Sequence, residues 1–382
     1  MNDLSRNGRI LVVTNDFPPR AGGIEAMVRQ LLAQLPPEQV VVHASNQPDA
    51  QRYDATLPYP VVRDPTRVLL PTPAVRDRAI ATMHGYGCTA VWFAAAAPLG
   101  LLGAPMRAAG AARTVATTHG HEIWWSTVPG AKAAMRRVGE VNDVVTFLTE
   151  YTRRRIARAF TPAAAARMQR LTSGVDASQF RPGVGREEIR RRYGLGDRPV
   201  VVCVSRLVPR KGQDMLIRAL PMVRRRIGDV ALLLVGEGPD DGRLRDLAER
   251  TGVRRQVFFA GRAPWGELSM HLAAGDVFAM PARTRHHGFD VEGLGICYLE
   301  AAAVELPVVA GDSGGAGEAV LDGRTGFVVD GGDPAVIADR LGWLLANPDQ
   351  ATAMGRAGRR WVQQRWRPQD QAQALARLLG QT

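Results

Sequence analysis

Residues 9–35 read RILVVTNDFPPRAGGIEAMVRQLLAQL, and this strand–loop–helix unit decides the fold class. The run Arg9–Thr14 is apolar and rich in β-branched residues, as expected of a buried strand. The loop that follows contains Gly22 and Gly23, and a helix is predicted from about Ile24 to Leu35. A wholly apolar strand that leads into a helix is typical of a parallel sheet covered by helices on both faces.

The alternation of strand and helix continues along the chain in two series. Further strands are predicted at residues 40–44, 91–95, 114–118, 144–148 and 168–172, and in a second series at 200–204, 231–235, 257–260, 277–280, 307–310 and 326–329. Helices are predicted near residues 132–139, 152–159, 213–226, 241–250, 267–274 and 295–304, and through the tail 335–379 apart from breaks at Pro348 and Pro368. We therefore predict an α/β protein with two facing Rossmann-like domains, whose ligands bind in a deep interdomain cleft at the carboxyl ends of the strands.

A polar, turn-rich stretch separates the two series, and the length of 382 residues suits two domains. We predict a first domain at residues 1–178, a linker at 179–198 and a second domain at 199–360. The remaining helix, at 361–382, is expected to pack back on the first domain.

Composition excludes several classes of protein. Hydrophobic residues make up 46% of the chain and charged residues 23%, which argues against a disordered or collagen-like chain. Cys88, Cys203 and Cys297 are far apart, which indicates a reducing, cytoplasmic compartment and no structural zinc. The sequence shows neither the apolar segment of a signal peptide nor a run of about 18 apolar residues, so we expect no membrane span.

The net charge of +12 predicts anionic partners, such as a nucleotide, a nucleic acid or an anionic membrane. Only Lys132 and Lys211 are lysines among the 49 basic residues, and this excess of arginine is typical of a GC-rich genome. No helix-turn-helix, zinc-finger or RNA-recognition signature accompanies the charge, so we do not expect a nucleic-acid partner.

Two motifs of the first series follow predicted strands. Gly22 and Gly23, at the start of a helix, leave backbone N–H groups free to hold an anion, although glycine turns are common in this fold class. His119 follows the strand at 114–118, where its imidazole can bind a hydroxyl or a charge. His121 would point to the other side of an extended segment, so we do not expect the two histidines to share a metal.

The loop Ser205–Gly212 (SRLVPRKG) follows a strand of the second series and carries two cations suited to a diphosphate. Arg206 offers a planar fork of donors and Lys211 a point charge. A solvated basic loop is the alternative interpretation. The segment Leu234–Pro239 (LVGEGP) is only faintly similar to a dinucleotide-binding loop, and we interpret it as a tight turn.

The most informative motif is His286–Glu300 (HHGFDVEGLGICYLE). Gly293 and Gly295 stand at the start of a predicted helix, whose free N–H groups form a cradle for an anion. Glu300 is expected on the cleft side of that helix, where it can accept hydrogen bonds from both hydroxyls of a ribose. Glu292, just before the helix, can accept sugar hydroxyls or stabilise a developing positive charge.

These motifs occur in the order found in a known family. GGIE at 22–25, SRLVPRKG at 205–212 and EGLGICYLE at 292–300 together resemble the retaining GT-B glycosyltransferases of family 4. HGHEIWW at 119–125 and SGVDASQFRP at 173–182 are similar to actinobacterial members that use GDP-mannose and phosphatidylinositol monomannoside. The resemblance implies a mannosyltransferase whose first domain binds the lipid acceptor and whose second domain binds the nucleotide sugar.

The resemblance also assigns roles to single residues. Arg206 and Lys211 would hold the diphosphate, and Glu300 the ribose. Glu292 would contact the 3- and 4-hydroxyls of the donor sugar, and His119 would lie beside its 6-hydroxyl and the reacting carbon. The remaining contacts are assigned to Gly22, Gly23, Gly293, Leu294, Gly295 and Ile296 around the diphosphate, to Gly261 and Arg262 at the base, and to Asp16 at the acceptor. The family is thought to attack on the same face as the leaving phosphate, which acts as the base, so we expect neither a protein nucleophile nor an obligatory metal.

The resemblance places the protein at the cytoplasmic face of the cell membrane, as a peripheral enzyme that meets a lipid acceptor. An arginine-rich, partly apolar surface can rest on anionic lipid, and a solvated surface is the alternative. Its residues are Arg63, Arg67, Arg76 and Arg78, which flank Val68, Leu69 and Leu70, together with Lys132, Arg136, Arg137, Arg153, Arg154 and Arg155. Trp124 and Trp125 line an acceptor or membrane edge in one interpretation and belong to the core in the other. Two other interpretations stay open: a family member with a UDP- or GDP-sugar donor and a soluble acceptor, such as inositol phosphate or a natural product, and a non-catalytic nucleotide-sugar binder.

Overall fold

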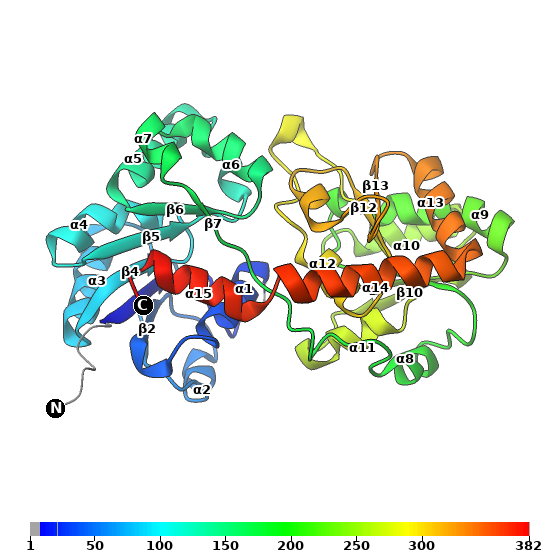
Figure 1. Cartoon of the computed structure of the whole chain (residues 1–382), viewed down its shortest axis with the longest axis horizontal. Coiled ribbons are helices and arrows are strands. Elements are labelled where there is room, and N and C mark those ends of the chain that lie inside the picture. Colours follow the sequence, from blue (N-terminus) through cyan, green and yellow to red (C-terminus); the bar gives the residue numbers. More distant parts are fainter. Residues whose placement is uncertain (1–7, 21, 382) are drawn as a thin grey trace. The chain divides into compact units, whose positions relative to one another are not determined.

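The computed structural model describes residues 8–20 and 22–381, and the chain divides into two compact units. The first unit comprises Met1–Gly174 together with Pro368–Thr382, and the second comprises Val175–Arg367 (Figure 1). The last helix of the chain therefore belongs to the first unit.

The first unit is built on seven parallel strands. In spatial order they are β3 (Val61–Arg63), β2 (Val40–Ala44), β1 (Arg9–Thr14), β4 (Cys88–Phe93), β5 (Arg113–Thr117), β6 (Val144–Phe147) and β7 (Gln169–Arg170). Val12 in β1 pairs with Val42 of β2 and Trp92 of β4, and all three side chains are buried. The strand order changes direction between β1 and β4, so a ligand site is expected at the carboxyl ends of these two strands.

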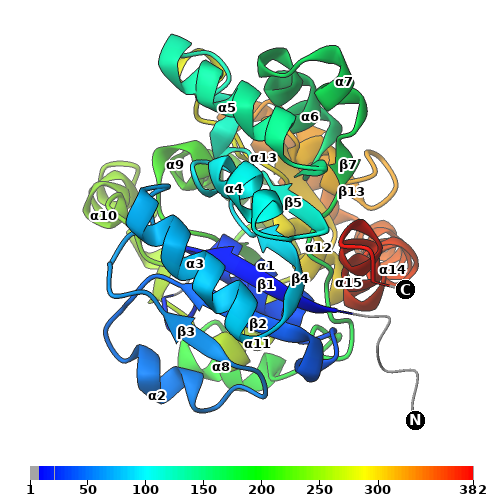
Figure 2. The ribbon, with the colours of Figure 1, turned by 90° about the vertical axis from the view of Figure 1, so that its left-hand side faces the viewer.

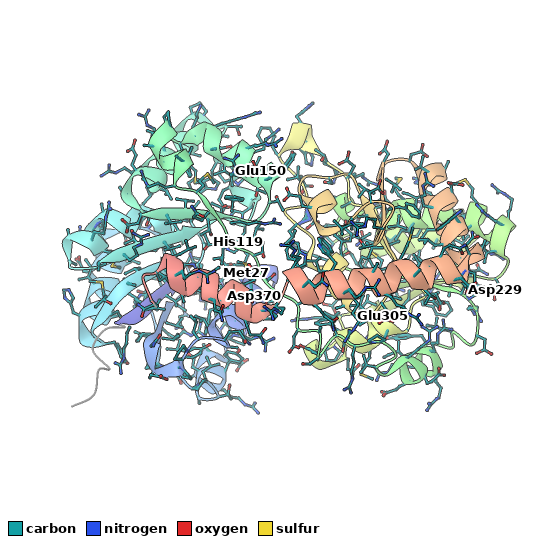
Figure 3. The ribbon with its side chains drawn as sticks, in the orientation of Figure 1. Met27, His119, Glu150, Asp229, Glu305 and Asp370 are labelled. Carbon is teal, nitrogen blue, oxygen red and sulfur yellow. The ribbon has the colours of Figure 1, made fainter. Side chains whose placement is uncertain are left out.

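Helices flank this sheet. They are α1 (Gly23–Leu32), α2 (Ala50–Asp54), α3 (Pro73–Gly85), α4 (Gly103–Ala108), α5 (Pro129–Val141), α6 (Glu150–Ile156), α7 (Pro162–Ala166) and α15 (Pro368–Leu378). Met83 of α3 is buried in one core cluster with Leu11 of β1 and Phe93 of β4, and Figure 2 shows α3 lying across the strands. Helix α15 packs on α1; Asp370 and Met27 mark the two helices in Figure 3.

The second unit has the same architecture with six parallel strands. In spatial order they are β10 (Val257–Gly261), β9 (Ala231–Val235), β8 (Val200–Val204), β11 (Val277–Met280), β12 (Val308–Gly311) and β13 (Gly326–Val329). Its helices are α8 (Arg186–Arg192), α9 (Gln213–Ile227), α10 (Asp241–Arg250), α11 (Leu268–Ala273), α12 (Ile296–Ala303), α13 (Pro334–Ala346) and α14 (Pro348–Arg365). Every residue of β8 and β9 is buried, which explains their continuous apolar sequences. The strand order changes direction between β8 and β11, which marks the expected ligand site of this unit.

The predicted α/β class and most predicted elements are confirmed. The strands predicted at 9–14, 40–44, 200–204, 231–235, 277–280 and 326–329 have these bounds in the structure. The tail forms three helices, and Pro348 and Pro368 are the first residues of α14 and α15. Proline is tolerated at the first position of a helix but not in its interior, so each break falls where the sequence predicts it.

Several elements are absent from the prediction, among them β3, α3 and α8. Strand β3 is three half-buried residues at a sheet edge, too short for a clear pattern. The apolar residues of α3 do not form one stripe, but its start carries a signal: the Thr72 side chain accepts a hydrogen bond from the N–H of Val75, and Pro73 follows Thr72. Helix α8 lies within residues 179–198, which the sequence suggests are a linker but which belong to the second compact unit.

Helix α8 is held to the second unit by a largely buried ionic cluster. The Arg190 side chain is 8% exposed, and its Nη2 lies 2.9 Å from Oδ2 of Asp276. Its Nε and Nη1 donate hydrogen bonds to the carbonyl oxygens of Ala274 and Gly196. Arg186 contacts the other carboxylate oxygen of Asp276 at 2.7 Å. Asp276 therefore neutralises two guanidinium groups that lie more than eighty positions before it in the sequence.

We predict that Asp276→Ala lowers the free energy of unfolding of the second unit by about 2 kcal/mol, because it leaves the buried Arg190 charge without a partner. The figure is below that of a fully buried pair because Asp276 is 34% exposed. Urea unfolding measures the change. The control is Asp339→Ala, whose carboxylate is 63% exposed and 3.6 Å from Arg226; it should change stability by less than about 1 kcal/mol. Equal effects of the two substitutions would contradict the prediction.

Candidate functional site

The carboxyl edge of the second sheet gathers the charged residues that the sequence singles out. Lys211 ends a single 3₁₀ turn, Pro209–Lys211, in the loop after β8, and Glu292 lies in the loop after β11. Lys211 Nζ is 2.6 Å from Oε2 of Glu292. Because β8 and β11 are neighbours at the switch point, their loops bring these two predicted site residues into contact.

Glu292 is an ionised carboxylate in a buried position. Only 8% of its side chain is exposed, and its backbone N–H donates to Oγ of Ser313 in the loop after β12. Burial alone would raise the pKa of Glu292, but the Lys211 ammonium and the Arg210 guanidinium outweigh burial and hold it below its ordinary value. The carboxylate is therefore charged at neutral pH and able to accept hydrogen bonds.

Arg206, the second predicted cation, is exposed and has no ion pair among the described residues. The backbone around it is fixed by Gln213, the first residue of α9, whose side chain is buried. Gln213 Nε2 donates to the carbonyl oxygen of Arg206 (3.1 Å) and to Oγ of Ser205 (2.8 Å). The guanidinium of Arg206 is thus free to bind an anion at a loop whose backbone is held in place.

The start of α12 forms the predicted cradle for an anion. Gly295 precedes the first residue of the helix with a φ of +78°, and a Cβ there would lie 2.4 Å from the ring of Tyr298. Only glycine fits this position without strain. Among the described residues, no side chain caps the first turn. The N–H of Tyr298 bonds to the carbonyl oxygen of Gly295, which leaves the N–H groups of Ile296 and Cys297 available to a ligand, with Gly293 and Leu294 leading into the turn.

Glu300 lies one turn further along α12 and is 8% exposed. Burial alone raises the pKa of Glu300, to about 7, and no neighbouring charge or hydrogen bond opposes it. In the part of the chain that the structure describes, this carboxyl group beside the cradle has no polar partner. Hydroxyl groups of a ligand would supply the missing hydrogen bonds.

The predicted base-binding residues lie at the end of β10. The carbonyl oxygen of Gly261 accepts a hydrogen bond of 2.8 Å from the N–H of Gly236. This carbonyl group is therefore already paired, and the backbone groups of Arg262, whose side chain is exposed, are the better candidates for contact with a base.

His119, in the first unit, follows β5 at the carboxyl edge of the sheet (Figure 3). Its Nε2 is 2.6 Å from the carbonyl oxygen of Ala94, which can only accept, so Nε2 carries the proton and Nδ1 holds a lone pair. Desolvation lowers the pKa of His119 below its ordinary value, so the ring is neutral at pH 7. The side chain can accept a hydrogen bond from a hydroxyl group.

Glu122 holds the His119 loop from behind. Its carboxylate is fully buried, and Oε2 accepts hydrogen bonds from the N–H groups of His119 and Gly120. Oε1 lies 3.5 Å from Nε2 of His121 and has no hydrogen bond. The rings of His119 and His121 are 6.4 Å apart, and no group of three His, Cys, Asp or Glu residues in the described part of the chain is arranged to hold a metal ion.

The glycine loop before α1 differs in one respect from the empty cradle that the sequence predicts. The carboxylate of Glu25, in the first turn of α1, reaches back over Gly22, where a Cβ would lie 2.2 Å from Oε2. Arg20 binds this carboxylate at 2.5 Å and also pairs with Asp16. An anion at Gly22 and Gly23 would therefore meet the Glu25 charge, and it would need Arg20 to turn toward it.

The structure thus places the predicted residues in two groups, one at the carboxyl edge of each sheet. In the second unit it brings Lys211 and Glu292 into contact; in the first, Asp16 pairs with Arg20 rather than with another predicted residue. The sequence alone assigns no role to Arg20, Glu122, Arg210, Gln213 or Ser313. The first four lie within or beside the quoted motifs, and Ser313 follows β12; their contacts depend on how the loops fold.

Comparisons with known proteins agree with the resemblance. A family model described as Glycosyltransferase Family 4 matches residues 21–179, and one described as Glycosyl transferases group 1 matches residues 185–361. The GDP-mannose-dependent alpha-(1-6)-phosphatidylinositol monomannoside mannosyltransferase of Mycolicibacterium smegmatis is 52% identical over 375 residues, which cover 97% of this chain and 98% of that protein. The GDP-mannose-dependent monoacylated alpha-(1-6)-phosphatidylinositol monomannoside mannosyltransferase of Corynebacterium glutamicum is 44% identical over 381 residues, 98% of this chain and 99% of that protein.

Solved structures agree on the fold. The crystal structure of Anabaena HepE (Alr3699) in complex with UDP and glucose matches with a TM-score of 0.82 and 19% identity, over 98% of this chain and all of that one. The architecture is that of the GT-B glycosyltransferases, and the chain belongs to glycosyltransferase family 4. Its full-length relatives at 44–52% identity are mannosyltransferases, so the resemblance to that branch of the family is confirmed.

The raised pKa of Glu300 should make the free energy of unfolding depend on pH. Because the pKa of Glu300 is about 7 in the folded protein and 4.5 in the unfolded chain, its contribution to stability is fully present below pH 4.5 and is lost as the pH rises to 7. Glu300→Gln removes this loss. The free energy of unfolding of the variant minus that of the wild type should therefore increase from pH 5 to pH 8, by at most about 3 kcal/mol.

Urea unfolding at the two pH values measures the difference. Glu249→Gln, which changes a glutamate that is 67% exposed, is the control and should show no such pH dependence. If Glu300→Gln changes stability equally at pH 5 and pH 8, Glu300 titrates at its ordinary pKa in the folded protein.

Proposed function

We propose that this chain transfers mannose from GDP-mannose to phosphatidylinositol monomannoside and so makes the dimannoside. The observation that carries the proposal is 52% identity along the whole chain to a mannosyltransferase named for this donor and acceptor. The geometry supports it, because the second unit joins a lysine, a buried carboxylate and a helix start at one sheet edge, a set of groups suited to a nucleotide sugar.

In this proposal, the second unit binds the donor. Arg206 and Lys211 bind the diphosphate together with the N–H groups at the start of α12, and the backbone of Gly261 and Arg262 contacts the base. Glu300 accepts hydrogen bonds from the ribose, and these bonds favour its charged form. Glu292 accepts hydrogen bonds from the 3- and 4-hydroxyls of the mannose.

The first unit supplies His119 and the acceptor contacts. The lone pair on Nδ1 of His119 accepts a hydrogen bond from the 6-hydroxyl of the mannose, since Nε2 is already committed to Ala94. Asp16 binds a hydroxyl of the acceptor after Arg20 turns from it toward the diphosphate at Gly22 and Gly23. Arg20 is 55% exposed and has room for this movement.

The chemistry we propose depends on charge stabilisation. As the bond from mannose to the diphosphate breaks, negative charge grows on the phosphate, where Arg206, Lys211 and the backbone N–H groups offset it. The leaving phosphate takes the proton of the acceptor hydroxyl on the same face. We assign no carboxylate nucleophile, because attack by the acceptor hydroxyl on the same face needs none, and Glu292 is occupied by the 3- and 4-hydroxyls of the mannose. These fixed cations supply what a divalent metal would supply, so we expect transfer in the presence of EDTA.

We propose an anionic membrane as the second partner of the first unit. Four of the exposed large apolar side chains in this unit lie in loops at the carboxyl edge of its sheet: Val68, Leu70, Trp124 and Val128. The loop that carries Val68 and Leu70 is held to the end of β1 by Asn15, whose amide binds both the N–H and the carbonyl group of Leu69. These exposed apolar loops support peripheral binding, which we propose at the inner face of the membrane. Among the described residues, no helix is long and apolar enough to cross a membrane.

Most of the basic residues that the sequence suggests for this surface lie close to carboxylates of the same unit. Arg63 is largely buried and paired with Asp54, while Arg78 is paired with Asp64. Arg76, Arg136, Arg137, Arg153 and Arg154 also have carboxylate partners nearby. Arg67 and Lys132 are exposed beside the apolar loops and have no such partner in the described structure, so we assign the lipid contact to them.

We predict that Val68→Ser with Leu70→Ser weakens binding to vesicles of phosphatidylinositol and phosphatidylcholine by at least about tenfold, since each inserted aliphatic side chain contributes about 1 kcal/mol. Sedimentation with the vesicles measures binding. Val336→Ser, at an exposed valine of the second unit, is the control and should bind like the wild type. Unchanged binding by the double variant would show that this loop does not contact the membrane.

The experiment that tests the function is transfer from radiolabelled GDP-mannose into phosphatidylinositol monomannoside in mixed micelles containing EDTA, with UDP-glucose and UDP-N-acetylglucosamine in parallel. We expect a labelled dimannoside from GDP-mannose alone, and a loss of turnover of at least about a hundredfold in Lys211→Ala, because Lys211 acts on charge that develops in the transition state. Transfer to a soluble acceptor, or from a UDP-sugar, would move the protein to another reaction of the same family.

A further inference from the structure

Glu292 has a second cation within reach besides Lys211. Arg210 Nη1 lies 3.7 Å from the same oxygen, Oε2, that Lys211 Nζ contacts at 2.6 Å. The two cations are consecutive residues in the loop after β8, and both lower the pKa of Glu292. A single carboxylate needs only one counterion, so in the ligand-free protein one of these two cations would be redundant.

Arg210 is anchored independently of Glu292. Its Nε is 3.1 Å from Oδ1 of Asp290, and its carbonyl oxygen accepts a hydrogen bond from the N–H of Arg283. Asp290 is held in turn by a pair of backbone hydrogen bonds to Arg285, 2.9 and 3.2 Å long, which close the loop between them. The guanidinium therefore has a fixed position, set by the loop after β11 that also leads to Glu292.

One donor of this guanidinium is unused. Arg210 Nη1 is buried and has no hydrogen-bond partner among residues 8–20 and 22–381, although a buried N–H without an acceptor costs about 1–3 kcal/mol. Its carboxylate neighbour, Oε2 of Glu292, is just beyond hydrogen-bond distance while Lys211 contacts the same oxygen. The arrangement leaves Arg210 ready to bind Glu292 as soon as Lys211 moves.

We propose that Arg210 is a positioning residue that takes over Glu292 when a donor diphosphate draws Lys211 away. This inference rests on the proposed function, in which Lys211 binds the diphosphate and Glu292 binds the donor sugar. Nη1 of Arg210 then closes on Oε2 and keeps the carboxylate charged and in place. The Lys211 ammonium then pairs with the diphosphate, and Arg210 is the counterion of Glu292.

Among the described residues, Lys211 and Arg210 are the cations that pair with the carboxylate of Glu292. In the described structure, the charges of Lys211 and Arg210 lower the pKa of Glu292, Cys297 and Tyr298 of α12 feel its charge, and Asp290 on its own segment pairs with Arg210. Burial raises the pKa of the Cys297 thiol and of the Tyr298 phenol, so both are neutral. Without Arg210, a buried Glu292 that loses Lys211 would have to take up a proton.

The test counts protons taken up when GDP-mannose binds at pH 6.5. Both phosphates of this ligand are esterified and stay ionised at that pH, so the count reports on the protein. Isothermal titration calorimetry in buffers of different ionisation enthalpy gives the number. We expect Arg210→Gln to take up as much as about one proton more than the wild type, and Arg210→Lys, which keeps the charge, to resemble the wild type.

Arg225→Gln, which removes an exposed arginine of α9, is the matched control and should bind like the wild type. In the transfer assay, the acid limb of the kcat profile should move to higher pH in Arg210→Gln, because the pKa of Glu292 rises when its cation is removed. A merely structural role would lower kcat by the same factor at every pH. Thermal unfolding shows whether the variants are folded.

Two results would overturn the proposal: equal proton uptake by Arg210→Gln and the wild type, or a raised KM for the donor with kcat and its pH profile unchanged. The second result would make Arg210 a direct diphosphate ligand. If the protein binds a UDP-sugar and not GDP-mannose, the donor assigned above is wrong, and the same proton count on the UDP-sugar still decides the role of Arg210.

Discussion

The donor side of the protein depends on the contact between Lys211 and Glu292. Each of these charges loses on the order of several kcal/mol of hydration when it is buried, and this loss is tolerable only when the partner and further hydrogen bonds replace water. The 2.6 Å contact and the nearby Arg210 meet that requirement, and the hydrogen bond from the Glu292 N–H to Oγ of Ser313 fixes the backbone that carries the carboxylate. Because the two charges come from the loops after β8 and β11, the strand order of the sheet is what allows the pair to form.

The first unit uses the same principle with weaker contacts. Parallel strands bring the loops that follow them to one edge, and a polar side chain then joins two of these loops. His119, after β5, binds the carbonyl oxygen of Ala94, after β4. Asn15, after β1, binds the backbone of Leu69, after β3. Each bond lies within its own unit, and each fixes a functional loop against the rigid sheet beneath it.

The sequence predicts most of the strands and the start of α12 because both are local patterns. The buried strands are continuous apolar runs, and Gly295 with Glu300 marks a helix start whatever surrounds it. The partners of these residues are not local. Glu25 covers Gly22, and Arg210 is anchored by Asp290 eighty positions later, because loops meet in space at a sheet edge. Helix α8 is missed for the same reason, since its burial depends on Asp276 and not on a stripe of its own.

The site has a lysine at position 211 and an arginine at position 210, and the two side chains suit different tasks. The chain has only two lysines among 49 basic residues, so a lysine at position 211 goes against a strong preference for arginine. A guanidinium presents its donors in a rigid plane and suits a fixed contact such as that of Arg210 with Asp290. An ammonium on a flexible chain is a point charge that can exchange one acceptor for another without realigning a plane. A cation that must pass between Glu292 and a diphosphate is better made from lysine, and one that must stay with Glu292 is better made from arginine.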